Sequence, residues 1–284
     1  MANFIRVDAE LVRRGMARSR TEAQEMITAG RVTLDGTLVT KPARQMTKDQ
    51  ALVVSDADRV EYASRGAYKL LGALEALGEN APQIRGVRAL DAGASTGGFT
   101  DVLLRRGARE VVAVDVGYGQ LAWRLREDPR VCVRERTNVR TLEPADVAPA
   151  PDLVVGDLSF ISLTLVIPAL VRCASESADF LLMVKPQFEI GKERLGAGGV
   201  VRNVCHHVET VYRVARSAQE AGLTICAVAA SPLPGPKGNV EYFLHMKAGG
   251  DADRDIGDNL LAAIKTAVRS GPAGPSAELD TMEL

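Results

Sequence analysis

Asp91-Ala-Gly93-Ala-Ser95-Thr-Gly97-Gly98-Phe99-Thr100 is the stretch that decides the fold of this chain. It follows an apolar run that ends at Leu90 and precedes a helical pattern, which predicts a turn between a strand and a helix. Small residues in such a turn let a ligand approach the backbone closely, as in nucleotide-like binding sites. A dinucleotide site has G-x-G-x-x-G directly after the strand, whereas D-x-G-x-x-x-G-G stands here. An ordinary glycine-rich turn of an α/β domain is the alternative interpretation.

Length and composition indicate a globular protein with two domains. The 284 residues leave room for one large domain and a small one, and 46% of them are hydrophobic and 25% charged. No run approaches about 18 apolar residues, and the amino terminus lacks the basic-then-apolar order of a signal peptide. The four scattered cysteines lack metal-type spacing. We therefore expect a cytoplasmic protein with reduced thiols, no membrane segment and no metal.

Beyond residue 63, predicted strands and helices alternate as in a doubly wound parallel sheet. The predicted strands are 88–91, 110–115, 131–135, 153–156, 180–185, 224–230 and 241–246. The link Ser231–Gly238 is too short for a crossover helix, so we expect the seventh strand to run antiparallel beside the sixth. The predicted fold class is α/β, a Rossmann-like seven-stranded domain behind a small amino-terminal α+β domain.

This ending and the turn at Asp91 resemble those of S-adenosylmethionine (SAM)-dependent methyltransferases, which implies SAM as the cofactor. Asp115 ends the second strand, where nucleotide-binding sheets place a carboxylate that accepts hydrogen bonds from ribose hydroxyls. Asn138, just after the third strand, is a candidate for contact with the adenine edge. A turn-forming aspartate and a loop asparagine are the alternatives. The turn residues expected to hold the cofactor are Asp91, Gly93, Ser95, Gly97, Gly98 and Phe99.

Residues 1–60 form a mildly basic segment with its own pattern of elements. Eight arginines and two lysines stand there against eight carboxylates. We expect Asp8 to cap a first helix, and the capping box Ser19–Glu22 to open a second helix that ends near Gly30. Asp35-Gly36 predicts a tight hairpin, and residues 51–54 offer a further strand.

The order R-x-x-A-x-x-x-I-x-x-G-x-V-x-L-D-G, from Arg20 to Gly36, resembles the S-four-like RNA-binding domain over about residues 3–59. This resemblance implies that basic side chains of the segment contact phosphates. A helical cap for the larger domain, with a solvated basic face, is the alternative interpretation. The candidate RNA-binding residues are Arg6, Arg14, Arg18, Arg20 and, in the larger domain, Arg65.

Four charged residues fall near the ligand-binding edge of the predicted sheet. Asp157 and Lys185 each follow an apolar strand, so both lie at carboxyl ends of parallel strands, where open α/β sheets bind ligands. Glu241 starts the antiparallel seventh strand and therefore lies at the same edge. Lys69 lies in a helix whose leucines face the core, so its side chain is expected to point away from them.

This K-D-K-E order resembles the FtsJ-type RNA ribose 2'-O-methyltransferases. Together with the amino-terminal domain and the runs Ser64–Lys69, Asp157–Ser162, Lys185–Glu189 and Gly198–Asn203, it resembles the TlyA family over residues 3–247. The resemblance implies SAM-dependent 2'-O-methylation of cytidine in 16S rRNA, 23S rRNA or both, within ribosomal subunits. Family members are also described as haemolysins, and a membrane-active haemolysin would need an amphipathic or spanning segment that the sequence does not offer.

The four residues are expected to act on a ribose 2'-hydroxyl, which is a poor nucleophile. The site must align its oxygen with the methyl group and help to remove its proton. Lys185 is the residue expected to do so, as proton acceptor or as electrostatic guide. Burial and the nearby Lys69 would favour the first role, whereas Asp157 and Glu241 would favour the second. Four ordinary ion-pairing residues are the alternative interpretation.

The predicted layout has four parts. They are an S-four-like RNA-binding domain at 1–59, a linker at 60–63, an FtsJ-like methyltransferase domain at 64–248, and an acidic, disordered tail at 249–284 with at most one helix over 260–268. A non-catalytic RNA-binding or ribosome-assembly protein is the second function that such a chain could have. The intact glycine turn and the four charged residues favour the enzyme.

Overall fold

The computed structural model describes residues 4–28, 30–54, 62–196, 198–250, 255–274, 276 and 278–282. The chain divides into two compact units, Met1–Glu61 and Tyr62–Leu284, each of which is described by itself. The division falls at the linker expected over residues 60–63.

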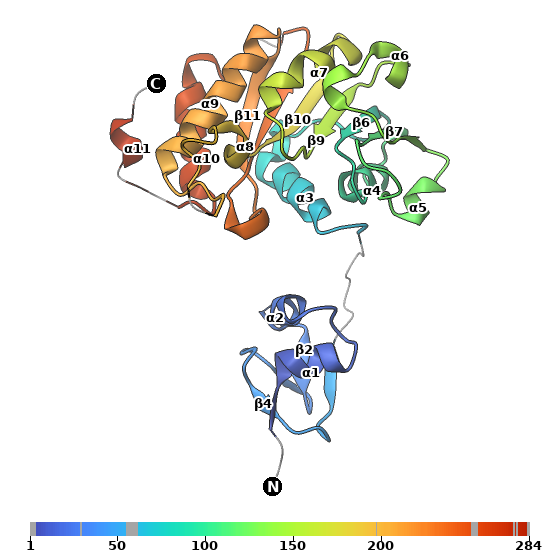
Figure 1. Cartoon of the computed structure of the whole chain (residues 1–284), viewed down its shortest axis with the longest axis vertical. Helices are drawn as coiled ribbons and strands as arrows, with labels where there is room; N and C mark the ends of the chain where they lie inside the picture. The colour runs from blue at the N-terminus through green and yellow to red at the C-terminus, as the bar shows by residue number, and fades with distance from the viewer. Residues whose placement is uncertain are drawn as a thin grey trace. The chain divides into compact units, whose positions relative to one another are not determined.

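The small unit is an α+β domain built around its own apolar core (Figure 1). Two helices, α1 (Val7–Arg13) and α2 (Arg20–Thr28), pack on short strands, and Leu11 and Ile27 are fully buried between them. The expected hairpin is confirmed, since Asp35 and Gly36 both have positive φ, as a tight hairpin turn requires. The strands are β1 (Ile5–Arg6), β2 (Val32–Leu34), β3 (Thr37–Leu38), β4 (Gln45–Met46) and β5 (Leu52–Val54), with β1 paired to β4 and β2 to both β3 and β5.

Asp8 does not have the capping role that the sequence suggests. Helix α1 starts at Val7, two residues earlier than a cap at Asp8 would imply, so Asp8 lies within its first turn and is fully buried. Its carboxylate accepts hydrogen bonds from the guanidinium groups of Arg6 and Arg20. Leaving a buried carboxylate without a partner costs more free energy than leaving a helix end uncapped. This explains why Asp8 pairs with arginines instead of capping the helix.

The large unit contains one seven-stranded sheet in the order β11-β12-β10-β9-β6-β7-β8. All seven predicted strands are present, each within one residue of its expected bounds. Strand β12 lies between β10 and β11 and is antiparallel to both, as its short connection predicts, whereas the other pairs that involve β6 to β10 are parallel. The strands are β6 (Arg88–Ala92), β7 (Glu110–Val114), β8 (Val131–Arg134), β9 (Leu153–Gly156), β10 (Asp179–Val184), β11 (Thr224–Ala230) and β12 (Tyr242–Lys247).

Helices cover both faces of this sheet, and the sequences of its central strands are therefore continuous apolar runs. In β9, Leu153 and Val155 belong to one core and Val154 to the other, because neighbouring side chains of a strand point to opposite faces. Figure 1 shows α3 and α4 on one face and α7 and α9 on the other. The helices are α3 (Gly66–Leu77), α4 (Gly98–Arg105), α5 (Trp123–Arg126), α6 (Pro144–Val147), α7 (Ile167–Cys173), α8 (Pro186–Glu189), α9 (Val204–Glu220), α10 (Leu260–Ser270) and α11 (Glu278–Thr281).

The expectation of a disordered tail is wrong for most of the described residues beyond 255. Helix α10 packs against α9 and β11, and Leu260, Ile264 and Val268 are buried in the same core as α9. Their spacing of four residues places them on one face of a helix, so burying that face stabilises the segment. Leu279 of α11 is also fully buried. The one helix that the sequence allowed, over 260–268, is present as α10, whereas the acidic and glycine-rich residues around it had indicated disorder.

Candidate active site

The large unit has a cleft of about 1290 Å³ at the carboxyl edge of its sheet. Typical small-ligand pockets measure roughly 300–1,000 Å³, so this cleft has room for a cofactor and part of a second molecule. Its lining comes from the turn after β6, the loops after β9 and β10, the start of α3 and the residues before β12. Among the lining residues are Lys69, Gly93, Ser95, Gly98, Phe99, Asp157, Ser159, Phe160, Lys185, Gln187, Phe188 and Glu241.

The glycine turn after β6 forms one wall of the cleft, and its glycines are required by close approaches. Gly93 has φ +85°, and a Cβ there would lie 2.9 Å from the carbonyl oxygen of Asp157. A Cβ on Gly98 would collide with Ser64 and lie 2.9 Å from the amide nitrogen of Ala67. Gly97 has φ +94° and precedes α4, while Ser95 adopts the left-handed region at φ +49°. The turn therefore exposes backbone and small side chains to a ligand.

Asp115 lies beside this turn, one residue beyond β7. Its carboxylate accepts hydrogen bonds from the amides of Ser95, at 2.8 Å, and Gly117, at 2.7 Å. An ionised carboxylate has about four acceptor positions, so two remain for the hydroxyls of a ribose. The exposed side chain of Asn138 caps a short 3₁₀ helix through the amide of Arg140, and neither Asp115 nor Asn138 is among the lining residues of the cleft. Its contact with adenine stays a prediction.

Asp91 supports the turn from beneath rather than lining the cleft. Its side chain is fully buried and accepts a hydrogen bond of 2.7 Å from the Thr100 hydroxyl. Burial raises the pKa of Asp91 to about 7, against the opposing effect of that hydrogen bond. Its second oxygen has no hydrogen-bond partner in the described part of the chain.

The structure brings together the four charged residues that the sequence singled out. Lys69 Nζ lies 2.6 Å from Glu241 Oε2 and 3.8 Å from Asp157 Oδ2. Lys185 Nζ forms an ion pair with the other oxygen of Asp157. Asp157 thus bridges the two lysines, and alternating charges run from Glu241 through Lys69 and Asp157 to Lys185.

These four charges are held in little contact with water. Lys185 and Lys69 are 6% and 13% exposed, Glu241 is fully buried, and Asp157 is the most exposed at 21%. Two cations and two anions of this kind compensate each other, because an unpaired buried charge is costly. Gln187 donates a further hydrogen bond of 3.2 Å to Glu241. The arrangement fixes two ammonium groups at the wall of the cleft, where they can act on a polar substrate.

The loop from Asp157 to Ser162 contributes residues that the sequence interpretation missed. Ser159 Oγ lies 3.0 Å from Lys185 Nζ. Phe160 is 91% exposed, has φ +64°, and lies 5.1 Å from the ring of Phe188 between centroids. A phenylalanine in the short loop directly after a predicted strand was the available signal. An aromatic pair with one exposed ring beside a charged cleft suits stacking on a planar ring.

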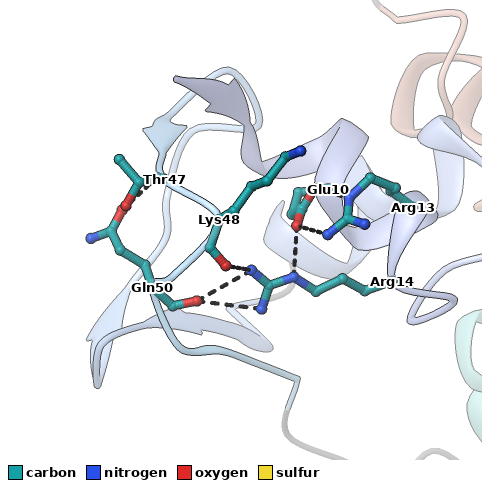
Figure 2. Close-up of polar contacts among 6 residues, drawn as sticks. All are labelled: Glu10, Arg13, Arg14, Thr47, Lys48 and Gln50. Carbon is teal, nitrogen blue, oxygen red and sulfur yellow. Dashed lines mark hydrogen bonds and ion pairs between the residues drawn. The ribbon is translucent and has the colours of Figure 1, made fainter. Parts of the chain in front are cut away.

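The other predicted basic residues lie largely on the small unit. Arg6 and Arg20 share the Asp8 carboxylate and remain about half exposed. Arg14 is 20% exposed, since its guanidinium bonds to Glu10 and to the carbonyl oxygens of Lys48 and Gln50 (Figure 2). Arg14 therefore braces the domain, a role the sequence did not predict.

The two remaining candidates, Arg18 and Arg65, are exposed. Contact of any of these arginines with RNA stays a prediction.

The described residues contain neither a cluster of metal ligands nor a membrane-spanning helix. No group of three or more His, Cys, Asp or Glu side chains is arranged to hold a metal ion in that part of the chain. No helix among those residues is long and apolar enough to cross a membrane.

Comparison with known proteins identifies relatives of both units. Residues 62–248 match the FtsJ-like methyltransferase family, and residues 5–50 match the S4 domain. The 16S/23S rRNA (cytidine-2'-O)-methyltransferase TlyA of Mycobacterium tuberculosis is 56% identical over 274 residues, which cover 96% of this chain and 100% of the relative. Hemolysin A of Brachyspira hyodysenteriae is 33% identical over 85% of this chain and 99% of its own.

A solved structure titled "Putative hemolysin from Streptococcus thermophilus" is also similar. It has 33% sequence identity and a TM-score of 0.69, and the match covers 95% of this chain and 97% of that one.

Proposed function

The chain belongs to the FtsJ-like methyltransferase family, and we propose that it methylates the ribose 2'-oxygen of a cytidine in ribosomal RNA with SAM as methyl donor. The observation that carries this proposal is the convergence of Lys69, Asp157, Lys185 and Glu241 in the cleft that the glycine turn lines. The TlyA relative with 56% identity is named for this reaction on both 16S and 23S rRNA. Ribosomal RNA as substrate also favours the cytoplasm as the site of action.

The residues of the glycine turn fit SAM. Gly93 and Gly98 let the turn pack directly against Asp157 and Ser64, which leaves its backbone and small side chains lining the cleft, and Asp115 keeps acceptor positions for ribose hydroxyls. When bound, SAM supplies an electrophilic methyl group on its sulfonium. Asp91, buried beneath the turn, would support it without direct contact.

Lys185 is the residue we expect to act on the target hydroxyl. Asp157 and Ser159 fix its ammonium group, which leaves a hydrogen-bond donor available to orient the ribose oxygen and to stabilise the negative charge that develops on that oxygen as its proton passes to solvent. Lys69, held by Glu241, keeps Asp157 in place on the other side. Positioning of the nucleophile is a large part of such catalysis, since a fixed geometry replaces a random encounter.

The RNA is expected to engage both units. Arg6 and Arg20 of the S4 domain are paired on Asp8 and still half exposed, so their guanidinium groups are pre-oriented for phosphate. At the mouth of the cleft, Phe160 and Phe188 offer a surface on which a nucleotide base can stack. A target inside folded RNA would leave its stack to reach Lys185.

The proposal is tested by mapping 2'-O-methylation on ribosomal RNA from cells with and without the protein. We expect the loss of methylation at one or more cytidines, and its restoration when purified protein and SAM are added to the unmethylated subunits. An unchanged methylation map, or methyl transfer to a base instead of a ribose, would contradict the proposal. Separate assays of small and large subunits would show whether one or both are substrates.

A further inference from the structure

Glu189, the last residue of α8, is a buried carboxylate that the proposed chemistry does not use. Its side chain is 5% exposed and is not among the residues that line the cleft. It accepts hydrogen bonds of 2.6 Å from the Ser162 hydroxyl and 2.8 Å from the amide of Leu163. Both carboxylate oxygens are therefore bound to the segment that follows Asp157. Burying a carboxylate is unfavourable in itself, so this contact calls for an explanation.

The segment that Glu189 holds is the one that shapes the cleft. It begins with Asp157, continues with Ser159, whose hydroxyl contacts Lys185, and presents Phe160 at the mouth. Phe160 has φ +64°, in the left-handed region that bulky side chains rarely adopt. Such a conformation is strained and persists only when surrounding contacts hold it. The bonds to Glu189 are such contacts, at the carboxyl end of the strained segment.

Glu189 also ties this segment to the second strand end of the site. Lys185 is the residue before α8, and Phe188 is the neighbour of Glu189 in the same short helix. The ring of Phe188 lies 5.1 Å from that of Phe160, between centroids. One carboxylate thus joins the element that carries Lys185 and Phe188 to the element that carries Asp157 and Phe160.

We propose that Glu189 is a positioning residue, which holds the segment 157–163 so that Ser159 supports Lys185 and Phe160 stands at the mouth of the cleft. This inference rests on the proposed methyl transfer for its functional consequence. Burial raises the pKa of the Glu189 carboxyl, although the bonds from Ser162 and Leu163 and the charge of Arg213 act in the other direction. The feature to which we assign the positioning is the pair of hydrogen bonds, at 2.6 and 2.8 Å, and the charge of the carboxylate is a separate feature.

Replacing Glu189 by alanine and by glutamine separates these features. Glutamine keeps the length of the side chain, can accept from the Leu163 amide and can donate to the Ser162 hydroxyl, whereas alanine removes both bonds. For Glu189→Ala we expect faster hydrogen exchange over residues 158–163. We also expect a fall of about 10- to 10²-fold in the single-turnover rate of methyl transfer, because small displacements of catalytic groups have effects of that size. SAM affinity should stay within about threefold in both variants, since the cofactor turn is elsewhere.

The outcomes distinguish this inference from the proposed function. Glu189→Gln should resemble the parent in exchange and rate, and an equal loss in both variants would overturn the inference. So would parent-like exchange and rate in Glu189→Ala. If Glu189→Ala does not fold, Ser162→Ala removes one of the two bonds and should show the same changes to a smaller degree. If the parent protein transfers no methyl group, the proposed function is refuted. Hydrogen exchange would still test whether Glu189 holds the segment 157–163.

Discussion

Replacing Lys185 by methionine should abolish methyl transfer while the fold persists. Methionine keeps most of the length and apolar stem of lysine but removes the ammonium group that contacts Asp157 and Ser159. Stabilisation of developing charge by one fixed donor contributes about 10²- to 10³-fold, and loss of hydroxyl positioning adds to this. We therefore expect the rate to fall by at least about 10³-fold, which corresponds to about 4 kcal/mol in the activation barrier.

The cost in stability should be much smaller. Asp157 is 21% exposed and still has Lys69 Nζ at 3.8 Å, so its carboxylate is not left buried without a cation. Loss of hydrogen bonds from a charged group then costs about 1–3 kcal/mol. Domains of this kind have stabilities of about 5–15 kcal/mol, so the variant should remain folded at 25 °C. Unfolding therefore cannot account for the expected loss of activity.

The assay is single-turnover incorporation of tritiated methyl groups into ribosomal subunits, with urea unfolding and SAM calorimetry as controls. Lys192→Met is the matched control, because Lys192 is an exposed lysine that lines the same cleft. We expect it to retain the parent rate to within a few-fold. A folded, SAM-binding Lys185→Met variant with a rate within about tenfold of the parent would refute the assigned role.

Three further results are expected. Asp115→Ala should weaken SAM binding by about 10- to 10²-fold in calorimetry, because it removes the acceptor for the ribose and for the Ser95 amide, and parent-like affinity would exclude that contact. Deletion of residues 1–59 should weaken RNA binding in filter assays far more than SAM binding, because the S4 domain has its own core and its removal leaves the core of the large unit intact. Unchanged RNA affinity would argue against docking through that domain. The pKa of Asp91 is about 7 in the folded chain, against an ordinary value of 3.8, so between these pH values the folded chain keeps a proton that the unfolded chain loses. The free energy of unfolding should therefore fall as pH rises from about 4 to 7, by on the order of 4 kcal/mol. Asp91→Asn should therefore remove most of the difference between urea unfolding at pH 5 and pH 8, and an unchanged difference would show that another group causes it.

The sequence was sufficient to predict the sheet because the relevant signals are local. Apolar runs, the glycine turn and the short link Ser231–Gly238 each specify their own element, and together they define the antiparallel β12. That strand direction places Glu241 beside Lys69, although 172 positions separate them in the chain. The four charged residues could therefore be expected at one edge before any coordinates were known.

The unpredicted features depend on contacts between distant segments. Asp8 and Glu10 are buried hubs for arginines, but their sequence context is that of an ordinary first helical turn. The hydrogen bond from the Leu163 amide to Glu189 and the positive φ of Phe160 likewise have no signal in the neighbouring sequence. In α10 the apolar face was visible in the spacing of its residues, yet the composition of the flanking residues favoured disorder.

The position of β12 also determines when, during synthesis of the chain, the sheet can be completed. Chains emerge from the ribosome amino terminus first, and domains fold as their segments become available. Strand β12 is the partner of both β10 and β11, so β11 has no neighbour in the sheet until residues 242–247 have been made. Glu241 arrives at the same moment, and until then Lys69 lacks its nearest carboxylate. A nascent chain that already carries the S4 domain, the glycine turn, Asp157 and Lys185 therefore still lacks the complete group of four charged residues until residue 241 has been made.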